Sequence, residues 1–157
     1  MPEPFEPRTD PDVDLRVAAD RRELTARPAT ILAAIAAGGV LGALARAGLQ
    51  HAVPHSPNGF PWATFAINTS GCLLIGVLMA VLGHLGGGHP LARPFLGVGV
   101  LGGFTTFSTY AVDVQQAIVA GAPGTALAYL AATVLGALVA VGVGDAATAG
   151  LLRRATR

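Results

Sequence analysis

The chain has 157 residues, of which 52% are hydrophobic and only 12% are charged, and its mean hydropathy is +0.58. This composition fits a polytopic membrane protein better than a soluble domain, and a formal net charge of +1 argues against a nucleic-acid partner. The only cysteine, Cys72, excludes an internal disulfide, and its apolar surroundings indicate a small packing residue.

Four apolar stretches cover roughly residues 30–49, 62–85, 94–120 and 124–147. Each is close to the ~20 residues that a helix needs to cross a bilayer. We therefore predict an all-α membrane protein with four transmembrane helices, formed by residues 29–148 and followed by a short basic C-terminal tail, residues 149–157. An even number of spans places both termini on the same side of the membrane.

Residues 1–28 precede the first span and are polar, with five prolines and five arginines. They predict a disordered tail. The segment has no apolar core of the kind found in a cleaved signal peptide, so the first span is expected to serve as its own insertion signal.

The first span carries Gly38, Gly42 and Arg46 at intervals of four residues, which places them on one helical stripe. The glycines favour close helix packing. Arg46 lies near the end of the span, where an arginine either extends to the interface or is held by a partner, and the residues alone leave both alternatives open.

Two pairs of histidines lie at or beyond the ends of the apolar stretches. His51 and His55 have helical spacing, but Pro54 stands between them and no third ligand is near. His84 and His89 flank a run of three glycines. We interpret all four as loop histidines and not as metal ligands.

The second span contains Asn68 deep in its apolar region, on a stripe with Thr64 and Cys72. An asparagine is costly in lipid. It either hydrogen-bonds a neighbouring helix or lines a polar pathway, and both readings remain open.

The third span is a poor continuous helix. Gly102 and Gly103 each cost about 1 kcal/mol of helix propensity, and four of the next six residues are Thr or Ser. We therefore predict a break near the middle of this helix. A broken backbone in hydrocarbon must be buried or line a hydrated cavity, and such interruptions are commonly ion sites. Just after the break, Phe107 and Tyr110 share one helix face.

The fourth span carries a face of small residues around Thr133, formed by Gly136, Ala137 and Ala140. The Thr133 hydroxyl either bonds back to its own helix or points into the bundle.

Nine of the ten arginines are expected on one side of the membrane, and only Arg46 borders the other. The positive-inside rule then predicts that both termini, and the tail of residues 1–28, are cytoplasmic. The nine are Arg8, Arg16, Arg21, Arg22, Arg27, Arg93, Arg153, Arg154 and Arg157.

The chemistry available inside the spans favours passive conduction. Asp113 and Asp145 lie near span ends, so a buried proton relay is missing, and no nucleophile, metal-ligand cluster or cofactor motif indicates an enzyme. Amide and hydroxyl donors and the edges of aromatic rings suit an anion. Carbonyl oxygens freed at the break offer the opposite, a site for a hard cation.

Three motifs resemble the Fluc fluoride channels, also named CrcB. They are Gly-Gly-Val-Leu-Gly-Ala-Leu-Ala-Arg (38–46), Phe-Ala-Ile-Asn-Thr-Ser-Gly-Cys-Leu-Leu-Ile-Gly (65–76) and Gly-Gly-Phe-Thr-Thr-Phe-Ser-Thr-Tyr (102–110). The third is highly specific, and the likeness covers about residues 30–145. The resemblance implies a plasma-membrane channel that exports fluoride passively, works as an antiparallel dimer and holds a structural sodium ion.

The resemblance also implies roles for individual residues. Carbonyls of Gly102 and Thr105 would bind sodium, and Arg46 would have a structural role. The pore would be lined by Asn68, Phe107, Tyr110, Ser108 and Thr133. Tyr110 stands where the family usually has Phe, and Thr133 where Ser is expected.

The strong arginine bias bears on the implied dimer. A homodimer of opposed subunits needs a chain that inserts both ways, so a biased chain suggests an antiparallel heterodimer with a homologue; both assemblies are retained.

Two other functions compete with a channel. A small multidrug-type transporter requires a glutamate in the first span, and this span has none. In a structural protein without transport, the break would serve only for helix packing.

Overall fold

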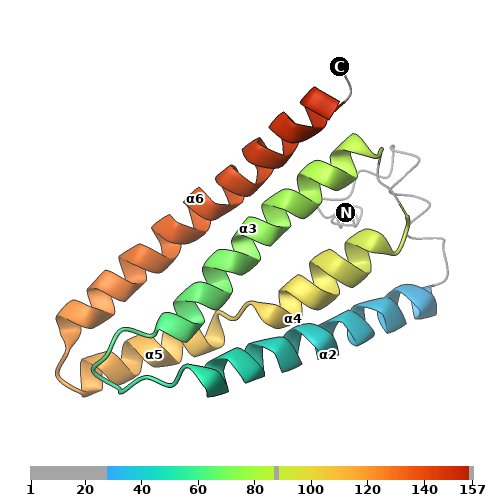
Figure 1. Ribbon diagram of the computed structural model, residues 1–157. Helices are drawn as coiled ribbons and strands as arrows, with labels where there is room; N and C mark the ends of the chain where they lie inside the picture. Colours follow the sequence, from blue (N-terminus) through green and yellow to red (C-terminus); the bar gives the residue numbers. More distant parts are fainter. Residues whose placement is uncertain (1–27, 87–88, 156–157) are drawn as a thin grey trace, which may run out of the picture.

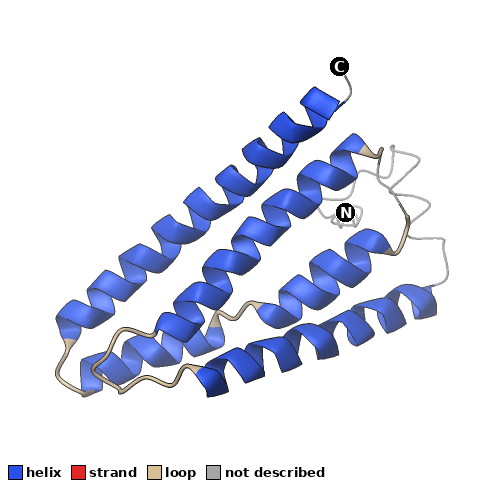
Figure 2. Cartoon of the chain, viewed as in Figure 1, coloured by secondary structure: helices blue, strands red, loops and turns tan. Residues whose placement is uncertain are grey.

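The computed structural model describes residues 28–86 and 89–155 (Figure 1). Except for Pro28, the predicted N-terminal tail lies outside the described residues. All regular structure in the described ranges is helical (Figure 2). The elements are α2 (Pro28–Ala52), α3 (Trp62–His84), η1 (Arg93–Leu101), α4 (Gly102–Phe104), α5 (Ser108–Val119) and α6 (Pro123–Ala155).

Four helical segments of the described chain are long and apolar enough to cross a membrane, which confirms the predicted spans. They cover Pro28–Ala52, Trp62–His84, Arg93–Val119 and Pro123–Ala155. The last helix runs further than its apolar stretch and includes most of the predicted basic C-terminal tail.

The third span is broken, as predicted, but the break comes after the two glycines and not at them. The span begins as the π-helix η1, continues through the short α4, and loses helical geometry at Thr105, whose backbone is extended (φ −75°, ψ 158°). Gly103 stays helical and packs on the first span, where an added Cβ would lie 3.0 Å from Gly39 Cα. Close packing on the first span therefore explains why residue 103 is a glycine. The helix is interrupted at the hydroxyl-bearing residues that follow it.

The helices pack as two pairs that meet at the break. α3 runs beside α6, and α2 runs beside η1 and α4, while α5 lies against the start of α6 (Figure 1). Gly42 faces the break region so closely that an added Cβ would lie 2.8 Å from the Phe104 nitrogen. This contact, with a similar one at Gly38, agrees with the packing interpretation of these glycines.

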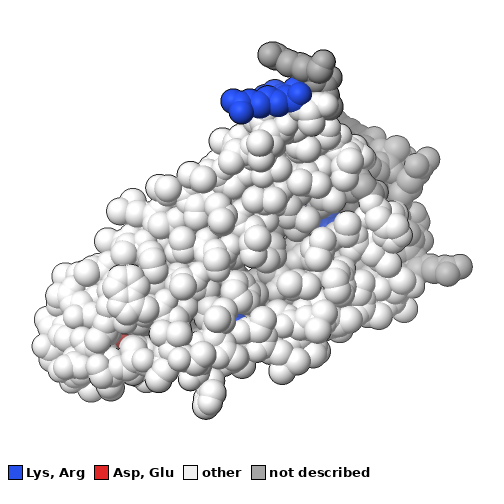
Figure 3. Space-filling view, viewed as in Figure 1, with Lys and Arg blue, Asp and Glu red and all other residues white. Residues whose placement is uncertain are grey.

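Most of the molecular surface is apolar, as lipid contact requires. Leu44 and Val139 are examples of large side chains that are more than half exposed, at 65% and 64%. Figure 3 shows a face almost free of charge, with arginine side chains gathered at the C-terminal end of α6. The chain is therefore a multi-pass membrane protein.

Candidate functional site

A cavity of about 390 Å³ lies where the broken third span faces α3 and α6. Its polar residues come from the second span, the break and the fourth span, as the sequence predicts for a site at an interrupted helix. The lining residues are Asn68, Cys72, Thr105, Thr106, Phe107, Tyr110, Thr133, Val134, Ala137 and Leu138.

Asn68 connects α3 to the break by two hydrogen bonds to one residue. Its Nδ2 donates to the Thr106 carbonyl at 2.9 Å, and its Oδ1 accepts from the Thr106 backbone N–H at 2.9 Å. The side chain thus satisfies both backbone groups of Thr106, the residue at the break. The hydrogen bond to a neighbouring helix, one of the two alternatives, is therefore present, and Asn68 also lines the cavity; a part in a polar pathway stays a prediction.

These bonds have a consequence for the carbonyl of Gly102. In a continuous α-helix the Thr106 N–H would donate to that carbonyl, four residues earlier. Here the Thr106 N–H donates to Asn68 instead. Gly102, which is exposed on the single chain, therefore presents a carbonyl without its helical donor.

The carbonyl of Thr105 loses its helical donor in the same way. The Thr109 N–H, its partner in a continuous helix, donates to the Thr106 hydroxyl at 3.2 Å. The Thr106 hydroxyl therefore satisfies a free N–H in the first turn of α5, as a capping side chain does. No described residue donates a hydrogen bond to the Thr105 carbonyl. The two carbonyls that the family resemblance implies as sodium ligands thus both lack a helical donor.

Sequence reasoning did not single out Thr106, although a hydroxyl residue just before a helix is a recognisable capping signal. Beside it, the Thr105 methyl group fits against Gly71, where a Cβ would collide with it. This close approach of α3 to the break keeps Asn68 within reach of Thr106.

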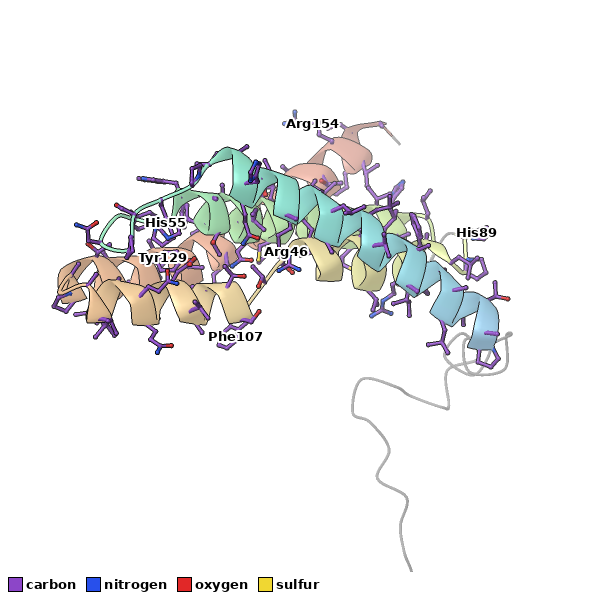
Figure 4. All side chains as sticks on the ribbon, turned by 90° about the horizontal axis from the view of Figure 1, so that it is seen from below. Arg46, His55, His89, Phe107, Tyr129 and Arg154 are labelled. Carbon is purple, nitrogen blue, oxygen red and sulfur yellow. The ribbon has the colours of Figure 1, made fainter. Side chains whose placement is uncertain are left out.

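The two aromatic residues after the break have different surroundings. Their ring centroids are 5.8 Å apart; Phe107 is 80% exposed on the single chain, whereas Tyr110 is 7% exposed. Figure 4 shows Phe107 projecting away from the helices. The Tyr110 hydroxyl donates to the Leu130 carbonyl of α6 at 3.3 Å, so it is tethered to that helix.

Thr133 contributes a buried hydroxyl to the cavity. The residue is 6% exposed, and its Oγ1 has no hydrogen-bond partner among the described residues. Its hydroxyl therefore does not bond back to its own helix, which was one of the two alternatives. An unpartnered polar atom in an apolar wall is free to bind a ligand.

Two other predicted site residues do not line the cavity. Ser108 is exposed and sits 3.3 Å from the Thr106 hydroxyl, but it is not among the residues that line the cavity. Arg46 follows Gly42 by one turn, and its Nε is buried without a partner in the described chain. Figure 4 places Arg46 near the middle of the bundle.

The structure brings together residues around Asp113 of α5 that the sequence did not predict as a group. Tyr129 of α6 is 1% exposed, packs at a tilt against the Tyr110 ring with centroids 5.1 Å apart, and donates to Asp113 Oδ2 at 3.4 Å. His55 does lie in a loop, but it faces the same carboxylate. Sequence spacing gave no signal for this contact, because the three residues come from three different segments.

Comparisons with known proteins find relatives that match most of the chain. Residues 33–145 match the family model described as CrcB-like protein, Camphor Resistance (CrcB). A Thermobifida fusca protein named Fluoride-specific ion channel FluC 2 is 56% identical over 127 residues, which cover 81% of this chain and 94% of the relative. Streptomyces coelicolor Fluoride-specific ion channel FluC 1 is 49% identical over 135 residues, 86% of this chain and 88% of the relative.

Proposed function

The chain belongs to the CrcB family of fluoride ion channels, which are not enzymes, and from this premise we propose that it exports fluoride passively across the plasma membrane and so lowers the cytoplasmic fluoride concentration. The observation that carries the proposal is the cavity at the helix break, with the Asn68 amide and the unpartnered Thr133 hydroxyl in its wall. An inside-negative potential favours export by about 2.3 kcal/mol per charge for each 100 mV.

The polar groups of the cavity suit a small anion. The Asn68 amide has two N–H donors, and only one is used on Thr106. Thr133 offers an O–H, and the edges of the Phe107 and Tyr110 rings carry the positive part of the aromatic quadrupole. No acidic side chain lines the cavity within the described residues. Such donors replace part of the hydration of fluoride without holding it tightly, which conduction requires.

A structural sodium ion fits the freed carbonyls of Gly102 and Thr105. Both are neutral oxygen ligands, which a hard cation prefers, and both have lost their helical donors to side chains. Two carbonyls are too few for a complete sodium shell, so the remaining ligands must come from another molecule. When bound, sodium would supply fixed positive charge at the break, and its role would be structural.

A second subunit would supply the missing ligands. Gly102 and Phe107 are exposed on the single chain beside the break, which fits their burial in an antiparallel dimer. The start of η1 and the end of α6 lie at the same end of the bundle as the start of α2 (Figure 1). Arg93 is the first residue of η1, and Arg153 and Arg154 are in the last turn of α6, so this arrangement supports cytoplasmic termini. This bias favours a heterodimer with an oppositely inserted homologue over a homodimer, and the names FluC 1 and FluC 2 among the relatives are consistent with it.

Fluoride efflux from liposomes, followed with a fluoride electrode, tests the channel. We expect rapid efflux without a proton gradient, lost in Phe107→Ile and reduced in Asn68→Ala. Leu32→Ile, a lipid-exposed position in α2, serves as the control and should retain full flux. Efflux that needs a proton gradient would favour a multidrug-type transporter, and no efflux from any assembly would favour a structural protein.

Expression with and without a homologue of opposite arginine bias tests the partner. We expect efflux only when both chains are present. Robust efflux from this chain alone would rule out an obligatory heterodimer and leave the homodimer.

A further inference from the structure

The outer side of α6 ends on an arginine. Val143, Ala147, Leu151 and Arg154 follow one another at intervals of four, four and three residues, so they lie along one helical stripe, called here the outer stripe. All four are exposed, and the two large apolar side chains, Val143 and Leu151, are exposed by 54% and 66%. The outer stripe is therefore apolar along its length and positively charged at its end.

The opposite side of α6 packs against α3. An added Cβ on Gly144 would lie 3.2 Å from the Val77 nitrogen, and one on Gly76 would lie 3.0 Å from the Asp145 nitrogen. This packing covers the side of α6 that contains Gly144. The outer stripe is left open on the single chain, where it faces the surrounding lipid.

The end of the outer stripe lies at the depth of lipid headgroups. Trp62 begins α3 and is 61% exposed, as is typical of a tryptophan at a membrane interface. The 23 residues of α3 span about 35 Å, slightly more than a hydrocarbon core of about 30 Å. α3 and α6 run side by side in the same direction (Figure 1), with Gly76 level with Asp145. Arg153 follows Asp145 by the same eight residues by which His84, the end of α3, follows Gly76, so it lies at the interface opposite Trp62.

This end of the molecule is positively charged. Arg153 and Arg154 are both exposed, and Figure 3 shows arginine side chains gathered there beside an almost uncharged face. Arg93, the first residue of η1, lies at the same end of the bundle. The nearest acid on α6 is Asp145, eight residues before Arg153 and thus about 12 Å away along the helix axis.

We propose that the outer stripe is a binding surface for an anionic phospholipid. Its acyl chain lies along Val143, Ala147 and Leu151, its headgroup phosphate contacts the Arg154 guanidinium, and the neighbouring Arg153 adds to the attraction. The inference does not depend on the proposed channel function, because a chain that conducts no ion would present the same surface.

Two features of the outer stripe favour a lipid over a free phosphate or an acidic peptide. A guanidinium binds a phosphate through two parallel N–H donors, and an arginine near an anionic membrane surface attracts it further. The exposed apolar side chains below Arg154 match an acyl chain, which neither a free phosphate nor a charged peptide supplies. Charge and apolar length therefore fit the two parts of one phospholipid.

Thermal unfolding of the full-length protein in detergent tests this proposal. Phosphatidylglycerol and phosphatidylcholine with the same acyl chains are added in increasing amounts, and the midpoint of unfolding is measured. We expect the anionic lipid to raise the midpoint at lower concentrations than the neutral one. In the double variant Arg153→Gln/Arg154→Gln, the concentration of phosphatidylglycerol that gives half of the rise should increase roughly fivefold for each arginine, and the response to phosphatidylcholine should stay unchanged.

The double variant Arg153→Lys/Arg154→Lys keeps both charges and should retain most of the preference for phosphatidylglycerol. Glycerol 3-phosphate, which has the phosphate without acyl chains, should give no rise at the same concentrations. An equal response of the wild type to the two lipids, or an unchanged preference in the Gln variant, would overturn the proposal. So would a full rise with glycerol 3-phosphate, which would assign the arginines to a free phosphate. Loss of the oligomer in the Gln variant, seen by size-exclusion chromatography, would assign the stripe to a subunit contact and also overturn it. Fluoride efflux is measured separately, so these outcomes leave the proposed channel function standing.

Discussion

The side chain of Asn68 replaces a helical neighbour for Thr106, with both of its hydrogen bonds at 2.9 Å. One amide from the second span thereby stabilises a gap in the third and lines the cavity beside it. The same bond leaves the Gly102 carbonyl without its helical donor. The proposed anion site and the proposed sodium site thus share a single residue.

Replacing Asn68 with Leu should destabilise the protein. The change keeps side-chain volume but leaves two backbone groups of Thr106 unsatisfied, each at a cost of about 1–3 kcal/mol. We expect a lower midpoint of thermal unfolding in detergent. Ser70→Ala is the matched control, because the Ser70 hydroxyl bonds only to carbonyls of its own helix. An unfolding midpoint for Asn68→Leu equal to that of the control would contradict the role assigned to the amide.

Thr133→Val should separate conduction from stability. The Thr133 hydroxyl has no partner among the described residues, so its removal breaks no hydrogen bond and the unfolding midpoint should stay the same. Fluoride flux should fall roughly tenfold or more, because a hydrogen bond to a charged ligand contributes about 1.5–3 kcal/mol. Thr133→Ser keeps the hydroxyl and should retain flux. Equal flux in the Val and Ser variants would show that the hydroxyl does not meet the ion.

Tyr110→Phe should leave conduction nearly intact. The Tyr110 hydroxyl bonds the Leu130 carbonyl and is not free in the cavity, so the ring edge remains after its removal. We expect flux within about twofold of wild type and a stability loss of about 0.5–1.5 kcal/mol, the usual contribution of one hydrogen bond. Stability is read from unfolding in detergent and flux from liposomes. A large loss of flux would assign the hydroxyl a direct part in conduction.

Sodium removal should abolish activity if the carbonyls of Gly102 and Thr105 hold a structural cation. Efflux is measured after purification with choline in place of sodium, and again after sodium is restored. We expect loss followed by recovery. Thr106→Val should raise the sodium concentration needed for recovery. Without the Thr106 hydroxyl, the Thr109 N–H has lost its acceptor and can return to the Thr105 carbonyl, where it competes with sodium. Full activity in choline would remove the case for a cation at these carbonyls.

Much of the architecture follows from local features of the sequence. Apolar runs of membrane-spanning length predict the four helices, and the cluster of Thr and Ser after Gly103 predicts a break. The exact position of the break could not be predicted from the sequence. Gly103 remains helical because it packs on the backbone of Gly39, a tertiary contact that helix propensity does not contain.

The site was predictable as a set of polar residues but not as a network. Asn68 and Thr133 stand out because amides and hydroxyls are rare in apolar spans. The partner of Asn68 depends on the close approach of Gly71 to Thr105, and the contact of His55 with Asp113 depends on how a loop folds over two helices. Neither contact follows from the spacing of residues along the chain, so both became visible only in the structure.

The central claim, passive passage of charged fluoride, is tested most directly by making efflux depend on charge compensation. Liposomes with the conducting assembly are loaded with potassium fluoride and diluted into potassium-free buffer, with and without the potassium carrier valinomycin. The account predicts slow release until valinomycin is added and rapid release afterwards, because each departing fluoride leaves positive charge behind. Equally rapid release without valinomycin would mean that fluoride leaves in a neutral or proton-coupled form, and would contradict the account.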